Sequence, residues 1–320
     1  MLFQLRSALA YRYFEYRTRG IDRTPPLSSD AASPCEIHTM LGTRDITMYL
    51  LAIKSLLLHV PGLSVVVHSD GSLGEAEASR LRRHVTGVKV IDHAAADEAA
   101  GRALVDFPLL KQWRLHDAAY RRLVDVEIWR RAPRVIILDS DVITNHHPRE
   151  VAAWARAGER PFMLGQPAKN PAPPEASSSP PAMAHVQVQF LAQVPELSRI
   201  LQTKPLFIQG GTAGFCGYLR ELSLERTQAA LAAALDLGLP MHQWGGDQCL
   251  VIYLLSTAGA ERLPGDRYLN FDPSVREAAD QASIIHFYGT HRFHGLVYPR
   301  LAAAAVRTMA APRQRSLSVV

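Results

Sequence analysis

Residues 134–142, with the sequence RVIILDSDV, constrain the fold more than any other stretch of the chain. Their apolar residues lie on both faces of an extended segment, as expected of a strand buried between two layers of helices. Asp139 and Asp141 follow at its carboxyl end. In open α/β sheets the ligand lies in the crevice beyond the carboxyl ends of the strands. The segment therefore predicts an α/β fold with two carboxylates at a binding crevice.

The Asp139-Ser140-Asp141 pattern has two interpretations. Carboxylates at this position suit a hard divalent cation, because Mg²⁺ and Mn²⁺ prefer oxygen ligands and keep positions open for water or a diphosphate. The alternative is a strand end followed by an ordinary turn, where aspartates are common. The pattern by itself leaves both open.

Composition indicates one large α/β domain with extensions. The chain has 320 residues, 48% of them hydrophobic and 20% charged, with no apolar run approaching the roughly 20 residues of a membrane span. Because the N-terminus lacks a secretory signal pattern, we expect a cytoplasmic protein. The three cysteines have no metal-type spacing and are expected to be buried thiols. The net charge of +5 comes from scattered arginines, so no nucleic-acid partner is expected.

Residues 1–34 are predicted to form a basic amphipathic arm and a Pro/Ser linker. Leu2, Leu5, Leu9 and Tyr13 recur at helical spacing among arginines 6, 12, 17 and 19. Such a helix can lie on an anionic membrane, here the inner face, as a peripheral contact. The alternative is that it packs on its own domain or on a second subunit. The main domain is expected at 35–300, with a Pro/Ser-rich loop at 165–181 and a frayed tail at 301–320.

Alternating strands and helices occupy the first half of the domain. Strands are predicted at 36–41, 64–68 and 88–92, and helices at 46–59, 73–84, 107–125 and 149–157, which indicates a parallel, doubly wound sheet. The turn after the first strand carries Thr43, Arg44 and Asp45. These residues either contact a nucleotide or simply cap the next helix.

Three later segments add candidate residues. Residues 207–217 are rich in glycine, which allows a ligand to approach the main chain closely. After a helix at 222–237, Asp247 precedes an apolar helix at 249–255, where it is either a functional acid or a helix cap. A last strand at 283–287 carries His286. An isolated histidine is usually structural, but beside Asp139 and Asp141 it would be a metal ligand.

In this order, the segments resemble the GT-A nucleotide-sugar glycosyltransferases, and most of all the family 8 retaining enzymes of the glycogenin and galactosyltransferase type. The similarity spans residues 36–294. It rests on segments 37–45, 138–141, 207–211 and 246–248, on Arg122, and on the pattern His286-x-x-Gly289-x-x-Arg292.

The resemblance implies a role for each matched residue. Asp139, Asp141 and His286 would hold Mn²⁺ or Mg²⁺. Thr43, Arg44, Arg122, Asp139, Ser140, Gly289 and Arg292 would bind the nucleotide diphosphate, although Arg122 could equally be a surface arginine. Gln209, Asp247 and Gln248 would orient the sugar or the acceptor. The chain departs from the family pattern at Arg292-Phe293-His294, where Lys-Pro-Trp is usual, and at Gln209, where the family has an asparagine.

The expected activity is transfer of a hexose from a nucleotide diphosphate sugar, with UDP as the expected nucleotide. The acceptor would be a carbohydrate or a lipid-linked molecule, and the anomeric configuration would be retained. One alternative is a sugar nucleotidyltransferase, but its glycine-rich loop is longer than Gly42-Thr43-Arg44. Another is a non-catalytic binding or scaffold protein that kept the fold.

Overall fold

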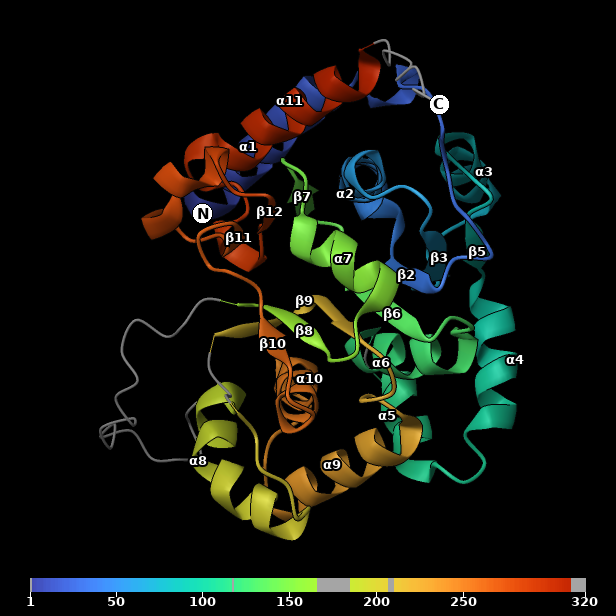
Figure 1. Cartoon of the computed structure of the whole chain (residues 1–320), viewed down its shortest axis with the longest axis vertical. Coiled ribbons are helices and arrows are strands. Elements are labelled where there is room, and N and C mark those ends of the chain that lie inside the picture. The colour runs from blue at the N-terminus through green and yellow to red at the C-terminus, as the bar shows by residue number, and fades with distance from the viewer. Residues whose placement is uncertain (1, 117, 166–184, 207–209, 312–320) are drawn as a thin grey trace.

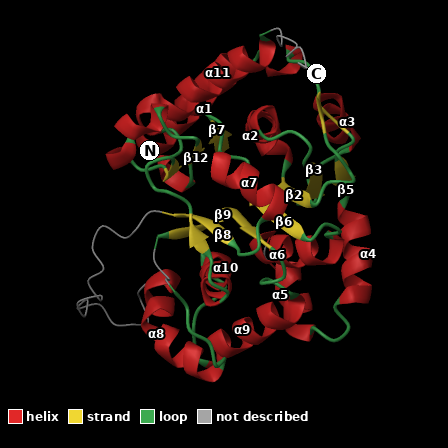
Figure 2. Cartoon of the chain, viewed as in Figure 1, coloured by secondary structure: helices red, strands yellow, loops and turns green. Residues whose placement is uncertain are grey.

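The computed structural model describes residues 2–116, 118–165, 185–206 and 210–311. Their centre is a seven-stranded sheet of order β10-β8-β9-β6-β2-β3-β5, with helices on both sides (Figures 1 and 2). Its strands are β2 (Cys35–Leu41), β3 (Ser64–Ser69), β5 (Lys89–Ile91), β6 (Arg134–Leu138), β8 (Phe162–Gly165), β9 (Gly211–Tyr218) and β10 (Glu261–Arg262). A smaller sheet has the order β11-β12-β7, with β7 at Val142–Thr144, β11 at Tyr268–Asn270 and β12 at Ile284–His286. A short parallel pair joins β1 (Leu27–Ser28) to β4 (Val85–Thr86).

The helices follow the predicted alternation with the strands. They are α1 (Leu2–Thr18), α2 (Ile46–His59), α3 (Glu75–His84), α4 (His93–Ala103), α5 (Pro108–His116), α6 (Ala118–Trp129), α7 (Arg149–Ala157), α8 (Val186–Ile200), α9 (Leu224–Asp236), α10 (Gly246–Thr257) and α11 (Val297–Ala310). Short 3-10 turns occur at η1 (Ile21–Arg23), η2 (Thr43–Asp45), η4 (Pro273–Val275), η5 (Glu277–Asp280), η6 (Gly289–His291) and η7 (His294–Leu296). Within the described residues, no helix has the length and apolar character needed to cross a membrane.

Strand β6 separates the two large hydrophobic clusters of the core. Ile136 and Leu138 belong to the cluster with α2 and α11, whereas Val135 and Ile137 belong to the cluster with α9 and α10. Alternate residues of a strand point to opposite faces, so β6 is covered on both faces, as its apolar sequence predicts. The expected α/β class with a mostly parallel central sheet is therefore confirmed.

The central sheet is mostly rather than entirely parallel, because β9 runs against its neighbours. This strand is antiparallel to both β6 and β8, with Leu138 opposite Phe215. In the sequence, its small residues at 211–214 suggested a loop that a ligand approaches closely. In the structure they form part of a strand beside the carboxyl end of β6. The strand carrying His286 lies in the smaller sheet, where β12 pairs with β11 and β7.

Two other predictions also need correction, namely the helix at 107–125 and the frayed tail after Arg300. The single helix predicted at 107–125 is two helices, α5 and α6. The chain was expected to fray after Arg300, but α11 continues to Ala310 and buries Leu301, Val306 and Met309. Its apolar residues recur at helical spacing and pack on the core, and its alanines are themselves strong helix formers. The predicted loop at 165–181 lies outside the described residues beyond Gly165.

The N-terminal helix α1 lies along α11 (Figure 1). Phe14 is fully buried and stacks on Tyr298 of α11 with ring centroids 5.1 Å apart. The interpretation that the arm packs on its own domain therefore holds for this side of the helix. However, Leu9 and Tyr13, predicted to form its apolar face, are exposed. The side chains of Leu2 and Leu5 lie outside the described residues.

Candidate active site

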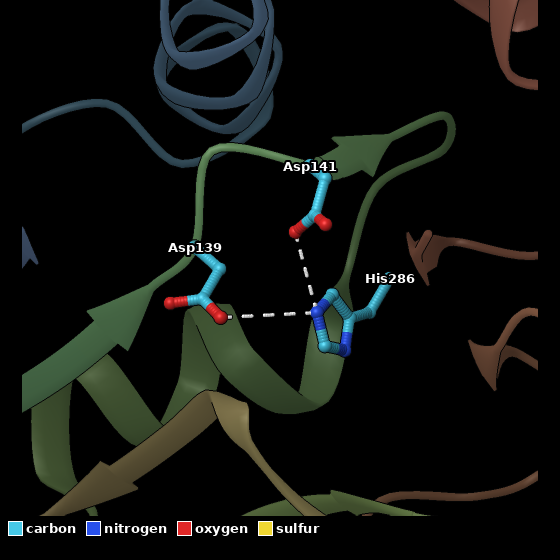
Figure 3. Close-up of side chains that lie close together, drawn as sticks. All are labelled: Asp139, Asp141 and His286. Carbon is cyan, nitrogen blue, oxygen red and sulfur yellow. Dashed lines mark ion pairs between the residues drawn. The ribbon is translucent and has the colours of Figure 1, made fainter. Parts of the chain in front are cut away.

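Asp139, Asp141 and His286 converge beyond the end of β6 (Figure 3). One potential ligand atom from each residue lies within 4.8 Å of the others. His286 Nε2 is 3.3 Å from Asp141 Oδ1 and 3.9 Å from Asp139 Oδ2. The structure thus brings together the three residues predicted as metal ligands, although His286 lies more than a hundred positions after the two aspartates in the sequence.

Pairing between two strands creates this convergence. Strand β7 begins directly after Asp141, and β12 runs antiparallel to it with His286 opposite Val142. The backbone N–H of Phe287 donates to the carbonyl of Asp141 at 2.9 Å. On the other side, the N–H of Asp139 donates to the carbonyl of Gly214 in β9 at 2.8 Å. The two aspartates are therefore held by backbone hydrogen bonds from two different sheets.

The imidazole of His286 is oriented by a residue that the sequence did not suggest. Its Nδ1 lies 2.9 Å from Asn270 Oδ1 and 3.4 Å from Thr212 Oγ1. An amide oxygen only accepts, so Nδ1–H donates to it, and in the neutral ring the lone pair of Nε2 then faces the carboxylates. Such a partner on the second nitrogen is typical of histidines that bind metals.

Gly214 keeps the space between these groups open. A Cβ atom at this position would lie 2.6 Å from His286 Nε2 and 2.7 Å from Asp139 Oδ2. Real Cβ atoms do not approach other atoms so closely, so any other residue would displace the histidine or the aspartate. Neither Gly214 nor Thr212 was predicted to be a site residue. The predicted residue in this region, Gln209, lies outside the described residues.

Two arginines neutralise the acidic groups. Arg122, on α6, has a side chain that is only 12% exposed, and it donates to Asp139 Oδ1 at 2.6 Å and to Asp247 Oδ2 at 2.9 Å. Arg292 donates from Nη2 to Asp141 Oδ2 at 2.6 Å. Burial works to raise the pKa of Asp141, but His286 and Arg292 outweigh it and hold that pKa below its ordinary value. The alternative of Arg122 as a surface arginine is wrong, because its guanidinium is buried between two carboxylates.

A cavity of about 760 Å³ opens over these residues. It is large enough for a nucleotide-sized ligand, since ligand cavities commonly measure roughly 300–1,000 Å³. Beside the metal-ligand candidates and both arginines, its walls include Asp247, Gln248, Gly289, Tyr288 and Trp244. Helix α8, which follows the undescribed segment, supplies Gln187, Phe190 and Leu191.

Three predicted nucleotide contacts lie away from the cavity wall. Thr43 is exposed and bonds to Ser72, its N–H donating to Ser72 Oγ at 2.9 Å and its hydroxyl to the Ser72 carbonyl at 2.5 Å. Arg44 is exposed, and its carbonyl accepts from the hydroxyl of Tyr11. Ser140, between the two aspartates, is half-buried and does not line the cavity, whereas Met40 from the end of β2 does.

The three converging residues fit a hard divalent cation. Two carboxylates supply the oxygen ligands that Mn²⁺ and Mg²⁺ prefer, and one imidazole can complete the protein ligands with positions left for other oxygens. His286 Nε2 and Asp141 Oδ1 lie 3.3 Å apart. A divalent cation could take the place of a proton between these two atoms.

Comparison with known proteins identifies the fold. No protein-family model and no curated protein matches this chain in sequence. The galactosyltransferase LgtC, solved with donor and acceptor sugar analogs, is similar in structure at 14% identity, over 87% of this chain and 98% of that one, with a TM-score of 0.51. The bifunctional glycosyltransferase WbbM matches 82% of this chain at 12% identity and a TM-score of 0.51, but this covers only 47% of WbbM. The chain therefore has the GT-A fold of nucleotide-sugar glycosyltransferases.

Proposed function

We propose that the chain is a metal-dependent glycosyltransferase that moves a hexose from a nucleotide diphosphate sugar, with UDP as the expected nucleotide, to a carbohydrate or lipid-linked acceptor. The observation that carries this proposal is the convergence of Asp139, Asp141 and His286 at the mouth of a large cavity in a GT-A fold. The structural similarity to LgtC supports it. A cytoplasmic location stays a prediction.

The charges in the cavity suit departure of a nucleoside diphosphate. As the bond between the anomeric carbon and the diphosphate breaks, negative charge accumulates on the leaving oxygen. Mn²⁺ or Mg²⁺ held by Asp139, Asp141 and His286 would supply positive charge to that oxygen. Arg292 lines the same cavity and adds a second cation, and its planar guanidinium can bind two phosphate oxygens at once. Gly289 lines the same cavity.

The surroundings of Asp247 support an orienting role for this acid. Its carboxylate is paired with the buried guanidinium of Arg122, and Asp139 shares the same arginine. An acid neutralised in this way is a weak nucleophile and a weak base. We propose that Asp247 and Gln248 hydrogen-bond the sugar or the acceptor. Attack by the acceptor on the leaving-group side would retain configuration without a strong protein base.

Asp141→Asn tests the proposal by calorimetric titration of UDP and GDP with and without Mn²⁺. We expect the wild type to bind UDP more tightly with Mn²⁺, and the variant to lose this metal dependence, because Asp141 is buried among the proposed ligands. Asp106→Asn is the matched control, since Asp106 is exposed. Metal-independent UDP binding in the wild type, or unchanged binding in Asp141→Asn, would remove the metal-site assignment.

A product assay then separates this activity from the alternative enzyme. Incubation with UDP-hexoses and acceptors should release UDP. Pyrophosphate release from a nucleoside triphosphate would instead indicate a sugar nucleotidyltransferase. Binding of neither nucleotide under any condition would favour the non-catalytic scaffold.

A further inference from the structure

The outward side of α1 exposes large apolar residues on successive turns. Leu9, Tyr13 and Tyr16 follow the i, i+4, i+7 spacing that aligns side chains along one face of a helix. They are 58%, 36% and 59% exposed, whereas Phe14 and Thr18 on the inner side are fully buried. Helix α1 thus has apolar side chains on two sides, of which only one is used for packing on α11. Grouped exposed apolar residues of this kind mark an interaction surface.

Four arginines cluster at the end of this apolar row that carries Tyr16. Arg17, Arg19, Arg23 and Arg307 line a hollow of about 660 Å³ between α1, η1 and α11, together with Tyr16 and three small or aliphatic residues. No carboxylate lines this hollow, and in the described part of the chain none of the four guanidiniums forms an ion pair. Arg19 instead lies over the ring of Tyr16, 4.5 Å from its centroid, and Arg17 bonds to the hydroxyl of Tyr13. We call Leu9, Tyr13, Tyr16 and these four arginines the α1 basic face.

The acids near the α1 basic face are Asp22, Glu15 and, in a second hollow that Tyr13 and Arg17 line, Glu277 and Asp280. Asp22, the acid of the neighbouring turn, already accepts from Arg80 at 2.8 Å and lies 3.2 Å from His84. Asp280 pairs with Arg300 at 2.6 Å, and Glu15 is exposed on α1. Asp22 and Asp280 are already paired with other arginines, so the four arginines of the face keep an excess of positive charge, which attracts an anionic partner.

We propose that the α1 basic face docks the protein on an anionic lipid bilayer. A soluble anion would use the arginines but would leave Leu9, Tyr13 and Tyr16 in water. A bilayer surface satisfies both sets, because arginines pair with lipid phosphates while leucine and tyrosine side chains enter the interfacial region. The proposal is independent of the transferase activity, since none of these residues lines the cavity at Asp139.

Co-sedimentation of the full chain with vesicles tests the docking surface. We expect binding to vesicles that contain phosphatidylcholine and phosphatidylglycerol, and weak binding to pure phosphatidylcholine. Arg19→Gln/Arg23→Gln/Arg307→Gln should weaken binding to the anionic vesicles by about fivefold for each arginine, or on the order of a hundredfold in total. The matched control, Arg102→Gln/Arg156→Gln/Arg220→Gln, removes the same charge from exposed positions on other elements and should bind as the wild type does.

A second variant tests the apolar part of the face. Leu9→Ser/Tyr16→Ser keeps every charge and should still weaken vesicle binding, including at high salt where the arginines are screened. All these side chains are exposed, so thermal unfolding should stay within a few degrees of the wild type.

Three results would overturn the proposal. The first is equal binding of the wild type to both kinds of vesicle. The second is equal loss of binding in the test and control arginine variants. The third is a concentration-dependent dimer that Leu9→Ser/Tyr16→Ser abolishes, because a second copy of the chain would then cover the face.

Discussion

In the candidate site, His286 is the residue whose chemistry depends most on its neighbours. Asn270 accepts from Nδ1 and so directs Nε2 to Asp139 and Asp141. If these residues bind a divalent cation, Asn270→Ala should weaken the Mn²⁺ dependence of UDP binding by about 10–100-fold, as is usual when such an outer partner is lost. Titration of Mn²⁺ at fixed UDP measures this effect.

Asn270→Asp is the matched rescue variant, because a carboxylate also accepts from Nδ1–H. It should restore most of the Mn²⁺ dependence. If Asn270→Ala binds Mn²⁺ as the wild type does, the hydrogen bond is structural only and does not orient the histidine for a metal.

The candidate site was partly predictable from single residues. Asp139 and Asp141 could be found because they end an apolar strand, and His286 because it ends another. Asn270 and Thr212 gave no signal, since each contacts His286 only after distant strands pair. Gly214 was one of several glycines in its segment, and only the position of β9 shows which of them lies against the site.

At the scale of elements, the packing of α1 on the domain depends on the buried Phe14 more than on the exposed residues Leu9, Tyr13 and Tyr16. Phe14 is fully buried and packs on Tyr298 and Phe293. Phe14→Ala should therefore lower the free energy of unfolding by about 3–5 kcal/mol. Urea-induced unfolding followed by circular dichroism measures it.

Tyr16→Ala is the control on the same helix, because Tyr16 is largely exposed, and it should change the free energy of unfolding by less than about 0.5 kcal/mol. Similar effects of both substitutions would mean that α1 does not pack on α11 in solution.

The sequence predicted regular elements well where one pattern dominated. The helix at 46–59 and the strand 134–138 have unambiguous apolar patterns, and the structure has them as α2 and β6. Strand β9 was missed because its glycines and small residues resemble a loop. What makes Gly211–Tyr218 a strand is its place between β6 and β8, which supply hydrogen-bond partners on both sides.

At the scale of the whole molecule, two buried histidines link stability to pH. His38 Nδ1 and His68 Nε2 lie 2.9 Å apart inside the sheet, and each ring is almost inaccessible to solvent. Burial lowers the pKa of His38, and burial together with His38 lowers that of His68 well below its ordinary value. Both rings therefore stay neutral in the folded chain while the unfolded chain, with pKa near 6.5, takes up protons.

Because the unfolded state binds more protons, the free energy of unfolding should fall as pH drops below about 6.5. Each histidine contributes up to about 1.4 kcal/mol per pH unit until its folded pKa is reached. Urea unfolding at pH 7, 6 and 5 measures the slope, and His68→Gln should make it shallower. A constant free energy of unfolding over this range would show that the pair is not held neutral.

The sequence by itself determined the local choices where one apolar pattern dominated, as in β6 and α2, and that two carboxylates end the central strand. These follow from the periodicity of apolar residues, which is a local property. The tertiary structure decided which distant residues share a site. It placed β12 beside β7 so that His286 faces Asp141, it set Arg122 between Asp139 and Asp247, and it turned Leu9 and Tyr16 outward by burying Phe14. Which distant strands pair, and which side of a helix packs on the core, depend on the assembled chain. No local pattern could therefore reveal them.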